Sequence, residues 1–123
     1  MDVVRVLLVD DQATFMHALA SVVGETAGFT VVGEAATGEE CLRLASEVGP
    51  DLVLLDVNLP VMDGVEVARR LRGGEAPPVV VLLSTYDEDV GERFVAESGA
   101  NAYVTKSAFA SDLLAQMWAR WAG

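Results

Sequence analysis

Apolar residues follow two alternating patterns along this chain: short continuous runs and longer stretches with helical spacing. The short runs, rich in Val and Leu, predict strands at residues 5–9, 29–34, 52–56, 79–83 and 101–105. The spaced stretches predict helices at residues 13–27, 38–48, 64–71, 87–98 and from about 107 to 121. Strands that alternate with helices predict a doubly wound α/β fold, in which right-handed crossovers place helices on both faces of a parallel sheet.

Turn and capping residues mark the ends of these elements. Gly28 follows the first predicted helix as a stop signal, and Gly49-Pro50 follows the second. Thr37 and Glu40 have the spacing of a capping box, which predicts the start of the second helix. Ser107 is expected to cap the last helix. The run at 29–34 alternates more than the others, which predicts a strand at the edge of the sheet.

Length and composition limit the classes of protein. With 123 residues and 52% hydrophobic content, we expect one domain, residues 1–123, with its own core. The net charge of −11 makes nucleic acid a poor direct partner and favours a cation or a basic protein surface. No apolar run approaches the length of a membrane span, and the single Cys41 fits a reducing compartment, so we expect a soluble, cytoplasmic protein. Cys41 is expected to be buried, and His17 to lie at the surface.

Polar residues with distinct chemistry stand where four of the predicted strands end. They are the pair Asp10-Asp11, then Asp56, the pair Ser84-Thr85, and Lys106. Because parallel strands end at the same edge of a sheet, we expect these side chains to converge there. Adjacent carboxylates repel each other unless a cation holds them, and an oxygen-only ligand set selects a hard ion such as Mg²⁺.

A magnesium site beside an ammonium and a hydroxyl is suited to a phosphoryl group. The nucleophile that this set offers is a carboxylate, and Asp56 is the best candidate because its strand is central. Asp10 and Asp11 are then metal residues. The alternative from the residues alone is an acidic, salt-bridged edge without chemistry.

Together these motifs resemble the receiver domain of two-component response regulators. The resemblance extends from Val6 to about Trp121 and depends on the combination of four motifs. They are Asp10-Asp11, the Asp56-x-x-x-Pro60-x-x-Asp63-Gly64 block, Ser84 after the fourth strand, and Tyr103-Val104-Thr105-Lys106. The resemblance implies a flavodoxin-like (βα)₅ fold with strand order 2-1-3-4-5.

The resemblance also implies a role for each site residue. Asp56 would accept a phosphoryl group from a sensor histidine kinase, with Mg²⁺ held by Asp11, Asp56 and the backbone carbonyl of Asn58, and with Asp10 acting through water. Lys106 would pair with the phosphoryl oxygens. Ser84 would bond the phosphoryl group, and Tyr103 would change rotamer with it. The responding surface would be the fourth helix, fifth strand and fifth helix.

Two positions depart from the usual family pattern, and two others tune the chemistry of the site. Ser107 follows Lys106 where many receivers have Pro, which resembles the subgroup joined to a helix-turn-helix DNA-binding output domain; this chain is then either a fragment or a stand-alone receiver. Thr85 is bulkier than the usual Ala and could narrow access to Asp56. In this family the residues at Asn58 and Tyr86 tune the loss of the phosphoryl group, and we expect Tyr86 to shield it.

Two other functions are compatible with parts of this pattern. A small-molecule phosphatase with an aspartate nucleophile needs a second Asp two positions later as general acid, and Asn58 cannot serve. A degenerate receiver that acts only as a protein-interaction module is the alternative that Thr85 keeps open. Trp118 and Trp121 share one helix side and either form a contact site or seal the sheet. Homodimer formation through the last helix stays open.

Overall fold

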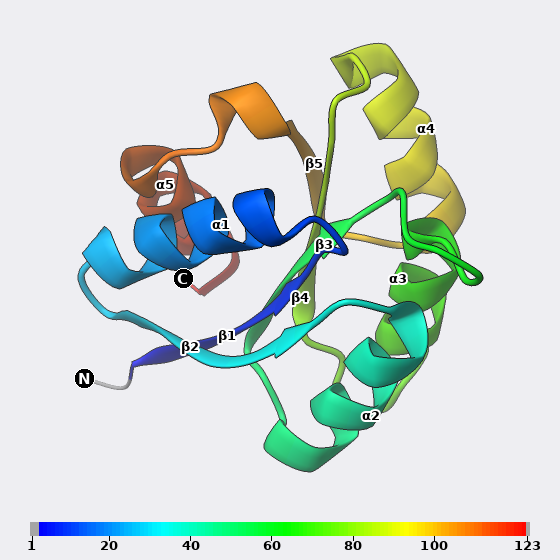
Figure 1. Ribbon diagram of the computed structural model, residues 1–123, viewed down its shortest axis with the longest axis horizontal. Coiled ribbons are helices and arrows are strands. Elements are labelled where there is room, and N and C mark those ends of the chain that lie inside the picture. Colours follow the sequence, from blue (N-terminus) through cyan, green and yellow to red (C-terminus); the bar gives the residue numbers. More distant parts are fainter. Residues whose placement is uncertain (1–2, 123) are drawn as a thin grey trace.

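The computed structural model describes residues 3–122, which form a central sheet with helices on both faces (Figure 1). The strands are β1 (Val4–Val9), β2 (Phe29–Ala35), β3 (Leu52–Asp56), β4 (Val79–Ser84) and β5 (Ala102–Thr105). The helices are α1 (Ala13–Glu25), α2 (Gly38–Val48), α3 (Gly64–Arg72), α4 (Glu88–Ser98) and α5 (Ser111–Ala122), with a short 3-10 turn, η1 (Lys106–Ala108). The predicted strands are therefore confirmed, with each end within one residue.

The sheet has five parallel strands in the order β2-β1-β3-β4-β5. This confirms the implied topology and the edge position of β2. Helices α1 and α5 cover one face, and α2, α3 and α4 cover the other (Figure 1). None of the described helices combines the length and the apolar content needed to cross a bilayer.

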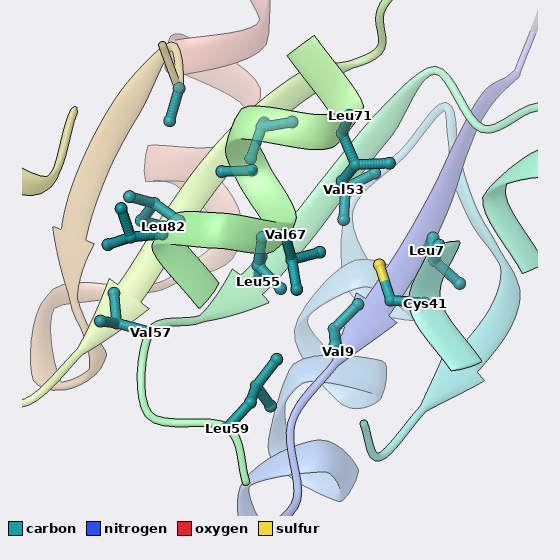
Figure 2. Packing of buried hydrophobic residues seen from close by; sticks show 14 of the residues in the cluster. Leu7, Val9, Cys41, Val53, Leu55, Val57, Leu59, Val67, Leu71 and Leu82 are labelled. Carbon is teal, nitrogen blue, oxygen red and sulfur yellow. The ribbon is translucent and has the colours of Figure 1, made fainter. Parts of the chain in front are cut away.

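Alternating residues of the central strands supply two cores, one on each face of the sheet. Leu7 and Leu55 point toward α2 and α3, where they pack with Val67 in the first core (Figure 2). Leu8 and Leu54 point the other way, into the second core beneath α1 and α5. β3 is buried along its whole length because both of its faces are covered.

The predicted positions of Cys41 and the tryptophans can now be assigned. Cys41 is buried in the first core, and burial raises the pKa of its thiol to about 12. Trp118 and Trp121 are partly buried against the second core, and Trp118 meets Phe29 edge to face at 6.2 Å. They therefore seal the α5 side of the sheet. His17 is exposed on α1, as expected.

The capping chemistry of α2 is as predicted, whereas the ends of two other helices need correction. The first predicted helix is too long, because α1 ends at Glu25 with Thr26 as its C-cap, and Gly28 lies in the turn before β2. The Thr37 hydroxyl accepts a hydrogen bond from the Glu40 amide at 3.1 Å, so the predicted cap of α2 is confirmed. The prediction that Ser107 caps the last helix is wrong, because Ser107 lies in η1 and α5 begins at Ser111. The intervening Phe109 has an extended backbone and packs against the second core, which delays the start of the helix.

Candidate functional site

Three carboxylates meet at the carboxyl edge of the sheet. Asp10 follows β1 and Asp56 ends β3, and these two strands are hydrogen-bonded neighbours. Oxygen atoms of Asp10, Asp11 and Asp56 all lie within 4.8 Å of one another. Asp10 and Asp56 are buried, whereas Asp11 is exposed. The sheet therefore holds two buried negative charges and one solvent-facing charge in a space that suits a small cation.

Lys106 brings the positive charge of the site from the end of β5. Its Nζ lies 2.9 Å from Asp10 Oδ2 and 3.6 Å from Asp56 Oδ2. The same ammonium lies 4.4 Å from the centre of the Phe15 ring on α1, which is a cation–π contact. Phe15 falls within the helix predicted at residues 13–27, and nothing in the sequence indicated that its ring would contact Lys106.

The carboxylates differ in how their oxygens are satisfied. Asp10 Oδ1 accepts a hydrogen bond from the Gln12 amide at 2.8 Å, and Asp56 Oδ1 accepts one from the Asn58 amide at 3.2 Å. Among the described residues, Asp10 Oδ2 is the buried side-chain oxygen that receives no well-aligned hydrogen bond, although the Lys106 ammonium is near. Lys106 supplies one positive charge for three clustered carboxylates, and an oxygen-only ligand set of this kind fits Mg²⁺.

The pKa of Asp56 is raised above its ordinary value. Burial is the largest cause, and the negative charge of Asp10 adds to it. The Asn58 amide and the Lys106 ammonium oppose the change without overcoming it. The charged form of Asp56 is thus held at a cost in free energy that a bound cation would offset.

Asn58 connects the end of β3 to the end of β4. Its Nδ2 donates a hydrogen bond to the Ser84 hydroxyl at 3.0 Å, and its Oδ1 accepts one from the Tyr86 hydroxyl at 3.3 Å. Ser84 is buried, whereas Thr85 and Tyr86 are exposed. The predicted tuning residues Asn58 and Tyr86 therefore touch each other, and both are linked to Ser84. Sequence spacing gave no sign of these bonds.

Tyr103 connects β5 to the loop between β4 and α4. Its hydroxyl donates a hydrogen bond to the Tyr86 carbonyl oxygen at 2.6 Å. Burial is the main reason that the pKa of the Tyr103 phenol is raised. The Tyr86 ring in turn meets Phe94 of α4 edge to face at 5.6 Å. The structure thus links both predicted switch residues, Ser84 and Tyr103, to the Tyr86 segment.

The loop between β3 and α3 requires the glycine of the Asp63-Gly64 motif. The Gly64 amide donates a hydrogen bond to the Val57 carbonyl at 2.8 Å, and a Cβ at residue 64 would overlap the backbone of Asp56 and Val57. The Asp63 carboxylate caps α3 through the Glu66 amide at 3.0 Å. The motif therefore folds the loop tightly back against the strand that ends in Asp56.

Comparison with known proteins agrees with this geometry. Residues 6–117 match the response regulator receiver domain. The positive alginate biosynthesis regulatory protein of Pseudomonas aeruginosa is 40% identical over 110 residues, which are 89% of this chain and 44% of that protein. The response regulator GacA of the same organism is 36% identical over 105 residues, which are 85% of this chain and 49% of that protein. This chain thus spans about half the length of these curated relatives.

Solved structures show the same fold. A two-component response regulator of the LuxR family from Aurantimonas sp. SI85-9A1 has a TM-score of 0.87 and 30% identity, with 99% of this chain and 87% of that chain covered. The chemotaxis protein CheY4 of Vibrio cholerae has a TM-score of 0.80 and 27% identity, with coverage of 96% and 98%. The flavodoxin-like topology and the acidic edge agree with these matches, and the chain belongs to the family of response regulator receiver domains.

Proposed function

We propose that this chain is a phosphorylation switch in which Asp56 accepts a phosphoryl group from a phosphohistidine on a sensor histidine kinase. The observation that supports it best is the placement of Asp56. Its Oδ2 lies 3.6 Å from Lys106 Nζ, and its carboxylate lies within 4.8 Å of carboxylate oxygens of Asp10 and Asp11. In the reaction, a bond forms between an Asp56 carboxylate oxygen and phosphorus as the phosphorus–nitrogen bond breaks. The departing imidazole keeps the electron pair and takes up a proton.

Lys106 and Ser84 would stabilise the transferred group. The ammonium already lies between two carboxylates, so it can pair with phosphoryl oxygens without being brought from solvent. The hydrogen bond from Asn58 uses a lone pair of the Ser84 oxygen, which leaves the hydroxyl proton free to be donated to a phosphoryl oxygen. Lys106 would therefore act as a pre-positioned donor, whereas Ser84 would move toward the phosphoryl group to donate its hydroxyl proton.

Asp11, Asp56 and the backbone carbonyl of Asn58 would hold Mg²⁺, and Asp10 would contribute through a water molecule. When bound, the ion supplies positive charge that neutralises both the carboxylates and the phosphoryl oxygens. The three carboxylates that lie within 4.8 Å of one another and the raised pKa of Asp56 support this assignment.

The response would pass to the surface formed by α4, β5 and α5. The bond between the Tyr103 hydroxyl and the Tyr86 carbonyl would let a displacement of Ser84 reach β5. Tyr86 would also shield the phosphoryl group from water. Two relatives are named as transcriptional regulatory proteins, PdtaR of Mycobacterium tuberculosis and LiaR of Bacillus subtilis. We therefore propose a cytoplasmic receiver, residues 1–123, that controls a helix-turn-helix output domain outside this chain or forms a homodimer.

Labelling with acetyl phosphate tests the proposal. We expect the chain to take up one phosphoryl group when Mg²⁺ is present and to lose this ability in Asp56→Asn or when EDTA replaces the ion. Asp112→Asn, which changes an exposed carboxylate on α5, is the matched control and should be labelled like the unmodified chain. Labelling of Asp56→Asn to the same extent as the control would refute the proposal.

A further inference from the structure

Gly91 stands at a position where a helix would normally carry a side chain. It closes the first turn of α4, is buried, and is followed by seven more helical residues. A glycine inside a helix lowers the folding equilibrium constant by about threefold to fivefold relative to alanine. A buried helical glycine therefore calls for a contact that only its missing side chain allows.

That contact is the ring of Tyr103. A Cβ placed at residue 91 would overlap three carbon atoms of this ring, deep inside van der Waals contact. The ring is held at its other end, where the Tyr103 hydroxyl donates to the Tyr86 carbonyl at 2.6 Å. Tyr86 directly precedes Asp87, whose carboxylate caps α4 through the Val90 amide at 3.1 Å. The ring of Tyr103 is thus fixed between the backbone of α4 and the loop that enters it.

We propose that Gly91 is the seat of the Tyr103 ring, a positioning residue that fixes where Tyr103 lies and thereby couples α4 to the end of β4. An alanine there forces one of two changes. The ring leaves α4 and gives up its bond to the Tyr86 carbonyl, or the first turns of α4 move away from β5. In both cases the connection from β5 to the loop after Ser84 is broken. The signalling consequence rests on the proposed function, whereas the seat itself does not.

Gly24 provides a matched control in the same protein. It lies in the last turn of α1, is exposed, and an added Cβ there would meet nothing within 4 Å. Gly24→Ala also replaces a helical glycine with alanine, but the added methyl group does not contact Tyr103. Any difference between the two substitutions therefore reports on the surroundings of Gly91.

A double-mutant cycle tests the seat by chemical denaturation. We expect Gly24→Ala to raise the folding equilibrium constant by about threefold to fivefold, and Gly91→Ala to lower it. In the Tyr103→Ala background we expect Gly91→Ala to change sign and to raise the constant as Gly24→Ala does. If Gly91→Ala does not fold but the double variant does, the seat is supported. Equal effects of Gly91→Ala in both backgrounds, or loss of folding in both, would overturn it.

Fluorine NMR tests the link to the switch, because Tyr86 and Tyr103 are the two tyrosines of the chain. With 3-fluorotyrosine incorporated and Tyr86→Phe used for assignment, the Tyr103 signal should move when beryllofluoride and Mg²⁺ are added. In Gly91→Ala that signal should start at a new position and no longer respond, while Asp56 is still labelled by acetyl phosphate. An unchanged Tyr103 signal in Gly91→Ala would overturn the seat. If acetyl phosphate does not label the unmodified chain, the proposed function is refuted, but the double-mutant cycle still tests the contact between Gly91 and Tyr103.

Discussion

Replacing the proposed nucleophile should stabilise the protein. Asp56 is buried at the end of β3, and its raised pKa shows that the folded protein disfavours its charged form. Asp56→Asn removes the charge and keeps the shape and an oxygen that can still accept from the Asn58 amide. We therefore expect the free energy of unfolding to increase at pH 7 in the absence of divalent ions.

The contacts of Asp56 give the size of this effect. At an effective dielectric of about 20, attraction to Lys106 at 3.6 Å amounts to about 4–5 kcal/mol. Repulsion from Asp10, within 4.8 Å, amounts to about 3–4 kcal/mol, and the exposed Asp11 adds a smaller screened repulsion. The attraction and the repulsions nearly cancel. The cost of removing the Asp56 carboxylate from water therefore decides whether Asp56→Asn raises or lowers the free energy of unfolding. We expect a gain of about 1–3 kcal/mol, which corresponds to about 3–10 °C in Tm.

The pH dependence follows from the direction of the shift. Between the ordinary pKa of 3.8 and the raised folded value, the folded protein binds more protons than the unfolded chain. Stability due to Asp56 therefore falls as pH rises through that window, and the full cost is present above it. The difference between Asp56→Asn and the unmodified chain should be largest at neutral pH and should vanish below pH 3.8.

Urea denaturation at pH 7 measures this difference, first with EDTA and then with excess Mg²⁺. A ligand at about one hundred times its Kd stabilises the folded state by about 2.7 kcal/mol, so the ion should reduce or reverse the advantage of Asp56→Asn. The exposed Asp112→Asn should change stability by less than about 0.5 kcal/mol in both conditions. An Asp56→Asn protein that is no more stable than this control in EDTA would refute the reasoning.

Three further predictions concern single side chains. Val61 is fully exposed and has a φ of 67°, a left-handed backbone conformation that is strained for a β-branched residue. Val61→Gly should therefore stabilise the fold by about 1–2 kcal/mol in urea denaturation, and a destabilised variant would contradict this backbone strain. Folding raises the pKa of the Cys41 thiol from 9.0 to about 12, so the unfolded chain loses the thiol proton at a lower pH than the folded protein. The free energy of unfolding should therefore fall from pH 9 upward, and this fall should be smaller in Cys41→Ala. An equally steep fall in the variant would exclude the thiol. Tyr86→Ala should shorten the lifetime of labelled Asp56 relative to Tyr86→Phe, and equal decay rates would count against shielding by the ring.

The sequence was sufficient to predict the ends of the strands and the edge of the sheet at which the site residues lie. Each of β1, β3 and β4 is a continuous apolar run, so its end could be located to one residue. Once the strands are parallel, the residues at their ends must share an edge, so Asp10, Asp56 and Lys106 were expected at the same edge of the sheet. The strand order came from the resemblance and not from the pattern, because periodicity alone does not say which strands are neighbours.

The rest depends on how elements approach one another in space. The bond between the Asn58 amide and the Ser84 hydroxyl joins residues 26 positions apart, and no local signal marks it. Ser107 has the chemistry of a cap, yet the need to bury Phe109 moves the start of α5 to Ser111. From the sequence alone, Gly91 is only a residue of low helix propensity. The structure explains the glycine, because the Tyr103 ring occupies the place of a side chain at residue 91.

The contacts of α4 predict which of its ends would move if the chain acts as the proposed switch. Its last turn is tied to α3, because Arg72 Nε donates to the Gly99 carbonyl at 3.1 Å and Arg69 Nη2 donates to the Glu97 carbonyl at 3.3 Å. Its first turns are held by the Tyr103 ring at Gly91 and by the capping loop, both of which lead back to the end of β4. A displacement at β4 therefore loosens the first turns while the arginines keep the last turn in place. Hydrogen exchange should show, on addition of beryllofluoride and Mg²⁺, a change confined to the amides of the first two turns of α4, and a uniform change along the helix would contradict this pivot.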